Sequence, residues 1–472
     1  MFRNLSIQGW KFFLSGNGIT VRTGKQFGLA AVLGVIVGLV TVAFYWMIHL
    51  ARVYVMEGLG RHQFLSTLPS GEAVRAFWTV EAVMDPHRWV LLFLPAVGAV
   101  LGSLLIHRFA KVEHARGTDS AVKAFHRGEM ISRTVIPVKS VASVLTVGFG
   151  GSGGYEGPVT LIGAACGSLL SKMLNLDARA RRILLAAGIA AGISALFRAP
   201  LAGAIFGAEI FYSSSDLEYD AIIPSFCASA VAYTVFACFY GWDPLFAMPN
   251  VTYENGLRLL PYFALAVVIT YGARFYIEFF RGTEAWFSHR KWPYWAKVGV
   301  GGLAVGAIGF AFPDILGSSY SIIQAALTSG DADFLVSGGT LTLIAFMSFF
   351  FVKVIATSLT VGSGGSGGLF APAIVCGGAL GAATGLFFAK ILPPWLGIHP
   401  AAFALVGMAG FLASSIRVPI TSIVMVAEIS GNHALLLPTM WVVGITFWLN
   451  NRWSLYRSQV HSHEQSPLYS PR

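Results

Sequence analysis

The chain has 472 residues, of which 55% are hydrophobic and only 11% are charged. Soluble globular proteins carry about 25% charged residues, so a soluble body of this size would lack the polar surface that it needs. The composition therefore predicts a polytopic membrane protein and excludes intrinsic disorder, collagen and secreted disulfide scaffolds. The net charge of +10 does not predict a nucleic-acid partner, because in a membrane protein the placement of charge matters more than its sum.

Basic residues are concentrated in particular segments. The first 26 residues contain four basic residues and no acid, and the segments 107–133 and 274–297 each contain more basic than acidic residues. Because cytoplasmic loops of membrane proteins are enriched in Lys and Arg, these two segments are predicted to be cytoplasmic loops. Residues 51–88 have balanced charge and are predicted to be external. The end segments 1–25 and 458–472 are both predicted to lie in the cytoplasm.

Hydrophobic segments of two kinds follow one another along the chain. Those long enough, or nearly so, to cross a bilayer core of about 30 Å lie near 26–50, 89–106, 220–241, 258–273, 297–312 and 337–357. Those too short or too interrupted by Gly and Pro for simple spans lie near 134–148, 156–172, 183–197, 200–214, 368–390, 403–416 and 418–430. Interrupted helices at membrane depth are tolerated only where they are buried in protein or line a polar cavity. The pattern is therefore that of a transporter or channel.

An internal repeat is the strongest feature of the sequence. Residues 138–158, VKSVASVLTVGFGGSGGYEGP, align without gaps on residues 352–372, VKVIATSLTVGSGGSGGLFAP. Further on, residues 197–210 align on residues 416–429. Duplicated halves with broken helices at corresponding positions are typical of secondary transporters, whose substrate site lies between the repeats near the middle of the bilayer.

Each copy of the repeat contains a glycine-rich loop that also fits the pattern G-x-G-x-x-G. A dinucleotide site would need a preceding strand and an acid about 20 residues later, and neither loop has that context. Within a membrane, such a loop lets the backbone approach an ion and presents N–H groups at the positive end of a helix, which favours an anion. Ser152 and Ser366 are additional candidate donors. The alternative is that the glycines only permit close helix packing.

Glu156 is an acid within the first of these loops, at the position where the second copy has Phe370. An ionisable side chain at a helix N-terminus inside the membrane is a functional candidate. When ionised, its carboxylate can occupy an anion site in place of the permeant ion; when protonated, it is neutral and can leave. Glu156 is thus predicted both to gate the anion path and to carry a proton, the alternative being a simple helix cap.

The chain contains three motifs in this order: GYEGP at 154–158, GLFAP at 368–372 and NRWSLYRSQ at 451–459. In these motifs and in their order, the chain resembles the CLC family of chloride channels and proton-coupled chloride transporters. The resemblance implies an all-α polytopic membrane protein built as a CLC-like inverted repeat of broken and tilted helices. It implies a homodimer with one pore per subunit, embedded in lipid, of the bacterial type without C-terminal regulatory domains. The location implied is the bacterial inner membrane. The single transmembrane domain would cover residues 26–457, with repeats at about 26–241 and 258–457.

The resemblance also implies a role for individual residues. Glu156 would be the gating glutamate. The anion site would be formed by Thr118, Gly157, Leu369, Phe370 and Tyr456. The supporting loop positions would be Gly154, Tyr155, Pro158, Gly368 and Pro372.

The sequence departs from the family pattern at three places. The G-S-G-I-P loop of the family is present only as the run 117–121, GTDSA, in which Thr118 can still offer a hydroxyl group. Tyr155 replaces the usual basic residue before the gating glutamate. The internal proton-transfer glutamate, which directly follows another glutamate in many transporters, is replaced by Ile210, which follows Glu209.

Roles are also predicted for two glutamates and two lysines at equivalent positions of the repeat. Glu209 and its repeat mate Glu428 are predicted to cap or pair buried groups near helix ends. Lys139 and Lys353, which occupy equivalent positions, are predicted either to raise the local potential for anions or to extend toward the membrane interface.

No pattern in the sequence predicts catalysis, a metal or a cofactor. The four cysteines lie inside apolar runs without the spacing of metal ligands, and no nucleophile with a neighbouring base is recognisable. His461 and His463 belong to a short polar tail that is predicted to be a solvated terminus. The main hypothesis is a proton-coupled chloride antiporter gated by Glu156. The alternative is a passive voltage- or pH-gated chloride channel, which Ile210 favours.

Overall fold

The computed structural model describes residues 19–60, 89–109, 117–246, 256–328 and 339–469. Within these ranges the chain is almost entirely helical. Eight of the described helices are long and apolar enough, by length and composition, to cross a membrane. The protein is a multi-pass integral membrane protein, as its composition predicts.

The two halves of the chain contain the same order of helices. The first half comprises α2 (Ile19–Ala51), α4 (Trp89–Phe109), α5 (Thr118–Arg127), α6 (Val135–Gly148), α7 (Glu156–Met173), α8 (Ala178–Phe197), α9 (Pro200–Glu209) and α10 (Tyr219–Tyr240). The second half comprises α11 (Leu260–His289), α12 (Tyr294–Ala311), α13 (Tyr320–Thr328), α15 (Gly339–Gly362), α16 (Phe370–Ile391), α17 (Pro400–Ser415), α18 (Pro419–Ser430) and α19 (Leu436–Leu449). A π-helix (Arg52–Leu59) continues α2.

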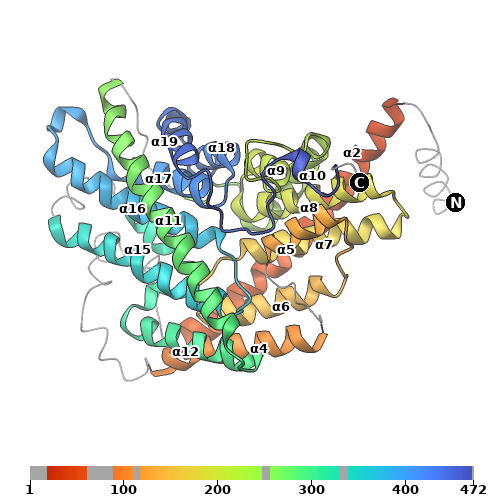
Figure 1. The fold of residues 1–472 in the computed structure, drawn as a ribbon, viewed down its shortest axis with the longest axis horizontal. Coiled ribbons are helices and arrows are strands. Elements are labelled where there is room, and N and C mark those ends of the chain that lie inside the picture. The colour runs from red at the N-terminus through yellow and green to blue at the C-terminus, as the bar shows by residue number, and fades with distance from the viewer. Residues whose placement is uncertain (1–18, 61–88, 110–116, 247–255, 329–338, 470–472) are drawn as a thin grey trace.

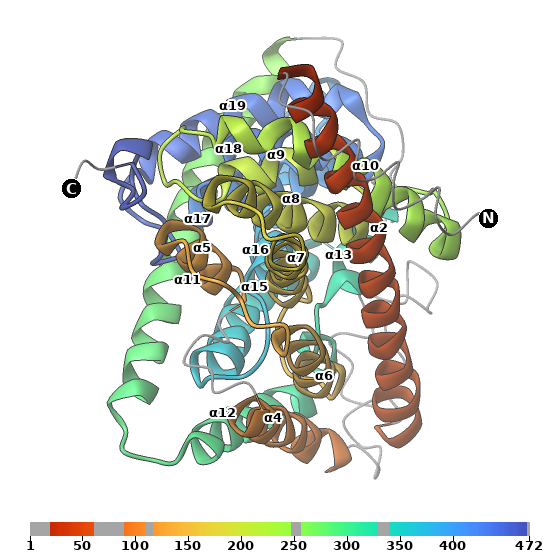
Figure 2. The ribbon, with the colours of Figure 1, turned by 90° about the vertical axis from the view of Figure 1, so that its right-hand side faces the viewer.

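Equivalent helices of the two halves pack in equivalent ways. Helix α7 lies against α8, and α16 lies against α17. The halves also meet through equivalent elements, α4 with α12 and α9 with α18. Figure 1 shows most of the first half on the right and most of the second half on the left, with α4 and α12 together at the bottom. In Figure 2 the long helices α2 and α11 flank the molecule on opposite sides.

The breaks between helices occur at the same residues of both repeats. Helix α8 is followed by Arg198 at φ 55°, and α17 is followed within two residues by Arg417 at φ 68°. The next helix then begins at a proline, Pro200 or Pro419. A left-handed residue ends a helix, and a proline is compatible with the first helical position because its missing N–H would have no partner there.

The structure corrects several predicted boundaries. Residues 274–289, predicted to lie in a loop, continue α11, because Tyr276, Ile277 and Phe280 maintain a buried face while charged residues occupy the other side. Helices α8 and α16, predicted to be too interrupted to span, are continuous and largely buried, so their glycines and alanines serve packing. Helices α5, α13 and α19 were not predicted.

Two glutamates join the halves by capping each other's helices. The Glu209 carboxylate accepts hydrogen bonds from the backbone N–H groups of Ile420 (2.8 Å) and Thr421 (2.8 Å) in the first turn of α18. The Glu428 carboxylate accepts the equivalent bonds from the first turn of α9, at 3.0 and 2.8 Å. The free N–H groups of a helix N-terminus need such partners when water is absent. These contacts agree with the predicted structural role of both residues.

Replacing Glu209 by Ala is expected to destabilise the protein more than replacing Glu428 by Ala. The Glu209 side chain is fully buried, whereas that of Glu428 is only partly buried. Leaving buried N–H groups unpaired costs about 1–3 kcal/mol each. Thermal unfolding of the detergent-solubilised protein measures the effect, and Glu209→Gln is expected to lie between the parent and Glu209→Ala. Equal losses in the two alanine variants would contradict this assignment.

Candidate functional site

The two glycine loops meet between the halves of the molecule. The N–H of Gly154 donates to the carbonyl of Gly368 (2.9 Å), and the N–H of Gly368 donates to the carbonyl of Gly154 (2.8 Å). A side chain on Gly368 could not be accommodated, because its Cβ would lie 2.6 Å from the backbone nitrogen of Gly157. Helices α7 and α16 begin directly after these loops, so two positive helix ends are brought close to one another.

Ser152 and Ser366 differ from their predicted role as anion donors. The Ser152 hydroxyl pairs with that of Thr357 (3.1 Å), and the Ser366 hydroxyl pairs with that of Ser143 (2.8 Å). The two contacts are equivalent under the repeat, and each joins one half to the other. Both serines are buried, and neither lies on the wall of the two cavities described below. Their hydroxyls therefore hold the loops together.

Glu156 extends from α7 to the N-terminus of α16 in the other half. Its Oε2 accepts a hydrogen bond from the backbone N–H of Ala371 at 3.2 Å. Its Oε1 accepts a second bond, at 2.7 Å, from the hydroxyl of Tyr320 at the start of α13. The side chain is 1% exposed. A carboxylate in this position takes the place that an anion would take at a positive helix end.

Tyr456 carries a buried hydroxyl group without a partner. This hydroxyl lies beside Thr118 and makes no hydrogen bond of good geometry within the described part of the chain. Thr118 is the first residue of α5 and is itself buried. Two hydroxyl groups at one point, one of them unpaired, form a site that can bind an anion through O–H donors.

Phe370 is the first residue of α16 and is 1% exposed. Its ring packs against Phe197 at a centroid distance of 5.2 Å and against Phe206 at 5.4 Å. The ring is therefore fixed, and its backbone N–H lies one residue before the N–H that Glu156 caps. The Phe370 N–H thus lies at the N-terminus of α16, the helix end that Glu156 caps.

Two cavities approach each other at Glu156. The larger, which we name the Tyr456 cavity, has a volume of about 630 Å³, and its wall includes Thr118, Gly157, Gly368, Leu369 and Tyr456. The smaller, which we name the Tyr320 cavity, has a volume of about 260 Å³, and its wall includes Tyr155, Glu156 and Tyr320. Glu156 lines only the smaller cavity and its neighbour Gly157 only the larger. The glutamate thus stands between them.

Four further predicted positions, described next, line neither of the two cavities. Pro158 and Pro372 are buried in the first turns of α7 and α16, and Gly154 forms the bridge between the loops. Ile210 is fully buried in the hydrophobic core and lines neither cavity. Its carbonyl accepts a hydrogen bond from the Gln459 side chain at 3.0 Å.

Lys353 does not extend to the membrane interface, because it is fully buried. Its ammonium group donates to the carbonyls of Ile315 (3.0 Å) and Gly317 (2.7 Å) and to the hydroxyl of Ser319 (2.8 Å). Lys353 therefore organises the turn that precedes Tyr320. Lys139 is likewise buried, at 2% exposed. Sequence reasoning missed Tyr320, because it lies outside the aligned segments of the repeat and neither α13 nor its counterpart α5 was predicted.

The C-terminal tail is docked on the protein, which corrects the prediction of a solvated terminus. The backbone N–H and hydroxyl of Ser458 donate to the two carboxylate oxygens of Asp119, at 2.8 and 3.0 Å. Asp119 directly follows Thr118, and Ser458 lies two residues after Tyr456. This contact fixes the segment that carries Tyr456 against the first turn of α5, so the tail positions the two hydroxyl groups of the site.

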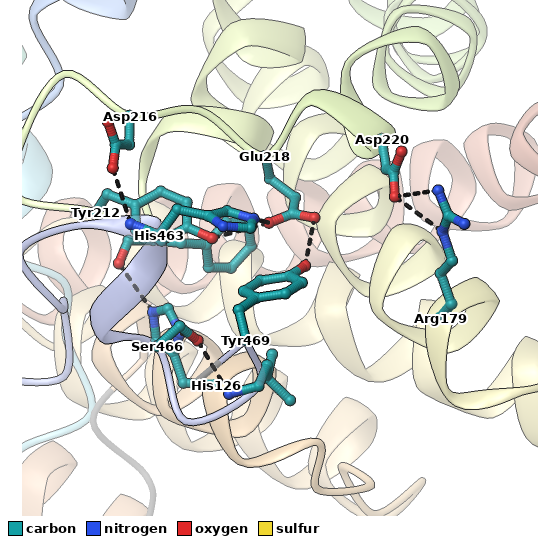
Figure 3. Close-up of polar contacts among 11 residues, drawn as sticks. His126, Arg179, Tyr212, Asp216, Glu218, Asp220, His463, Ser466 and Tyr469 are labelled. Atoms are coloured by element: carbon teal, nitrogen blue, oxygen red, sulfur yellow. Dashed lines mark hydrogen bonds and ion pairs between the residues drawn. The ribbon is translucent and has the colours of Figure 1, made fainter. Parts of the chain in front are cut away.

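Farther along, the tail is held by a cluster of aromatic, histidine and carboxylate side chains (Figure 3). The Glu218 carboxylate accepts hydrogen bonds from Tyr212 and Tyr469, both at 2.9 Å. The ring of His463 stacks on that of Tyr469 at 3.7 Å. The His126 ring contacts the hydroxyl of Ser466 and the carbonyl of Phe211, each at 2.9 Å.

The docked tail makes stability depend on pH through His126. Burial lowers the pKa of His126 below its ordinary value, so the unfolded chain binds a proton that the folded chain does not. The contribution is therefore present above about pH 6.5 and is lost as the pH falls below it. We expect the unfolding temperature of His126→Gln to fall less than that of the parent between about pH 7.5 and about pH 5.5. The exposed His461→Gln is the control; equal pH dependence in the two variants would contradict the assignment.

The Glu156 carboxylate lies at a buried helix N-terminus, between two cavities and between two repeated halves. This arrangement defines a class of protein: helical membrane proteins that move an ion through the interface of an inverted repeat. The family model described as voltage gated chloride channel matches residues 98–451. The chain belongs to this family, the CLC family.

Similar proteins agree with this assignment. The chain is 30% identical over 357 residues to the "Putative chloride channel protein ClcB-like" of Ralstonia nicotianae, covering 75% of this chain and 80% of the relative. It is 30% identical over 417 residues to the "H(+)/Cl(-) exchange transporter ClcA" of Yersinia pseudotuberculosis, covering 87% of this chain and 81% of the relative. The crystal structure of a CLC-type fluoride/proton antiporter has a TM-score of 0.74 at 20% identity and covers 95% of this chain and 100% of that chain. These likenesses confirm the predicted all-α CLC-like fold.

Proposed function

We propose that this protein exchanges chloride, or a similar small anion, for protons across the membrane, with Glu156 as gate and proton carrier. The observation that carries the proposal is the position of the Glu156 carboxylate at the N-terminus of α16, between the two cavities. Relatives that cover most of this chain are named as proton/chloride exchange transporters.

The anion path runs through the place that Glu156 occupies. An anion entering the Tyr456 cavity meets the hydroxyl groups of Thr118 and Tyr456 and the positive ends of α7 and α16. When Glu156 is protonated, its hydrogen bond from the Ala371 N–H weakens because the charge-assisted acceptor is lost. The carboxyl group then leaves, and an anion takes the freed N–H group.

The proton path uses the same carboxyl group. Glu156 receives its proton from the Tyr320 cavity, which it lines. Toward the other side, the wall of the Tyr456 cavity carries several titratable side chains, and His107 and Glu284 are the two to which we assign relay of the proton. Ile210 lines neither cavity, so the proposed proton path does not pass through it.

The orientation follows from charge. The Tyr456 cavity is lined by His107 and Lys297, which belong to the basic segments predicted to be cytoplasmic. We place this cavity on the cytoplasmic side of a bacterial inner membrane, with both termini in the cytoplasm. Residues 26–457 form one transmembrane domain, and the active form is a homodimer in lipid with one pore per subunit. The protein acts as a transporter and not as an enzyme.

A passive anion channel is the second candidate function. The absence of a carboxylate at Ile210 favours it, because a proton would then lack an acid beyond Glu209 along that route. Proteoliposomes under a chloride gradient, with the voltage set by potassium and an ionophore, distinguish the two functions. Chloride-driven uphill proton movement is expected for the exchanger; chloride flux without proton movement would establish the channel. Replacing chloride by fluoride in the same assay tests the preferred anion.

Glu156→Gln and Glu156→Ala are expected to reduce proton movement to the level of empty liposomes while leaving chloride flux of the same order as in the parent. Both changes remove the group that binds the proton, and neither removes the anion site. Glu428→Gln is the matched control, since it neutralises an acid that caps α9 away from both cavities. Proton movement that persists in either Glu156 variant would remove this residue from its assigned role.

A further inference from the structure

Tyr320 makes the shorter of the two hydrogen bonds between the Glu156 carboxylate and the rest of the protein. Its hydroxyl donates to Oε1 at 2.7 Å, whereas the Ala371 N–H donates to Oε2 at 3.2 Å. The tyrosine is half-buried and also lines the Tyr320 cavity. The Tyr320 hydroxyl therefore binds the Glu156 carboxylate on the side that faces the Tyr320 cavity.

The turn that precedes Tyr320 is held in a fixed conformation. Ser319 has φ 61°, a left-handed conformation that a non-glycine residue adopts only when its surroundings enforce it. The buried ammonium group of Lys353 binds the Ser319 hydroxyl and two carbonyls of this turn. The Gly317 carbonyl also accepts a bond from the N–H of Gly153, in the loop before Glu156, at 3.2 Å. The tyrosine and the glutamate are thus fixed relative to each other.

The internal repeat places Tyr320 at a position equivalent to that of Thr118. Helix α13 stands in the second half where α5 stands in the first, and each is preceded by a left-handed residue, Gly117 at φ 64° and Ser319 at φ 61°. Thr118 opens α5 with a hydroxyl on the Tyr456 cavity, and Tyr320 opens α13 with a hydroxyl on the Tyr320 cavity. The equivalent positions therefore present one hydroxyl donor to each cavity.

We propose that Tyr320 is a positioning residue that holds the ionised Glu156 carboxylate in the anion site, and that this hydrogen bond sets the pH at which the gate opens. The inference rests on the proposed function of Glu156. A hydroxyl donor binds a carboxylate about twice as strongly as a neutral carboxyl group, so the bond stabilises the closed, ionised gate and weakens when a proton arrives. The Lys353-bound turn keeps the donor in place while the carboxyl group moves.

Other charged and titratable groups line the Tyr320 cavity or interact electrostatically with Glu156. They are Tyr45 and His49 on α2, Arg52 on its π-helical continuation, Tyr155 just before α7, Lys353 on α15 and Tyr456 in the tail segment. All of them remain when Tyr320 is changed. A comparison of the parent with a variant at position 320 therefore isolates the tyrosine hydroxyl.

The test is chloride flux through proteoliposomes as a function of pH on the side of the Tyr320 cavity, in the parent and in Tyr320→Phe. Loss of a hydrogen bond to the ionised carboxylate is expected to move the midpoint of the flux–pH curve upward by about one pH unit or more. Because the ring is retained, packing is preserved. The matched control is Tyr233→Phe on α10, which removes a hydroxyl that donates to the carbonyl of Trp242. An unchanged midpoint in Tyr320→Phe overturns the proposal.

Two further measurements separate the effect of the Tyr320 hydroxyl from a folding defect and from failure of the proposed function. Replacing Tyr320 by 3-fluorotyrosine keeps the shape and strengthens the donor, so the midpoint is expected to move downward. In a Glu156→Gln background no carboxylate remains, and adding Tyr320→Phe is expected to leave the flux–pH curve unchanged. A shift in that background would show that Tyr320 acts without Glu156. Failure of the proposed function has a different signature, namely proton movement that survives in Glu156→Gln alone.

Discussion

Free N–H groups at buried helix N-termini are the constraint on which this structure depends. Broken helices leave these groups inside the membrane, where water cannot pair with them. The protein supplies carboxylates instead: Glu209 caps α18, Glu428 caps α9 and Glu156 caps α16. In each case the acid belongs to the opposite half, so the pairing of N–H groups also joins the halves.

The same kind of helix cap is built differently at Glu209 and at Glu156. Glu209 accepts two backbone bonds at 2.8 Å, is fully buried and lines neither the Tyr456 cavity nor the Tyr320 cavity. Glu156 accepts a longer backbone bond from Ala371, at 3.2 Å, and a bond from the side chain of Tyr320 on a cavity wall. A carboxyl group that an anion or water can replace is suited to gating.

The two halves are equivalent at the contacts that hold the glycine loops together, and they differ at the candidate site. The hydroxyl pairs Ser152–Thr357 and Ser143–Ser366 are equivalent and hold the two loops in one geometry. Where the copies differ, at Glu156 and its repeat mate Phe370, one half provides a carboxyl group on a cavity wall and the other an aromatic ring packed against two phenylalanines. Under the proposed function, this difference between the copies gives the protein one gating carboxyl group and not a symmetric pair.

The sequence by itself determined the membrane class and the duplication and singled out Glu156 as a candidate, because composition, alignment of the copies and one acid in an apolar loop are local or periodic properties. The tertiary structure alone decided which groups these residues meet. The donors to Glu156 and Glu209 lie 164 and 211 residues away in the chain, and the tail reaches Asp119 across 339 residues. Such contacts depend on how the two halves pack, and no local pattern encodes that packing. For the same reason Tyr320 and the docked tail escaped prediction.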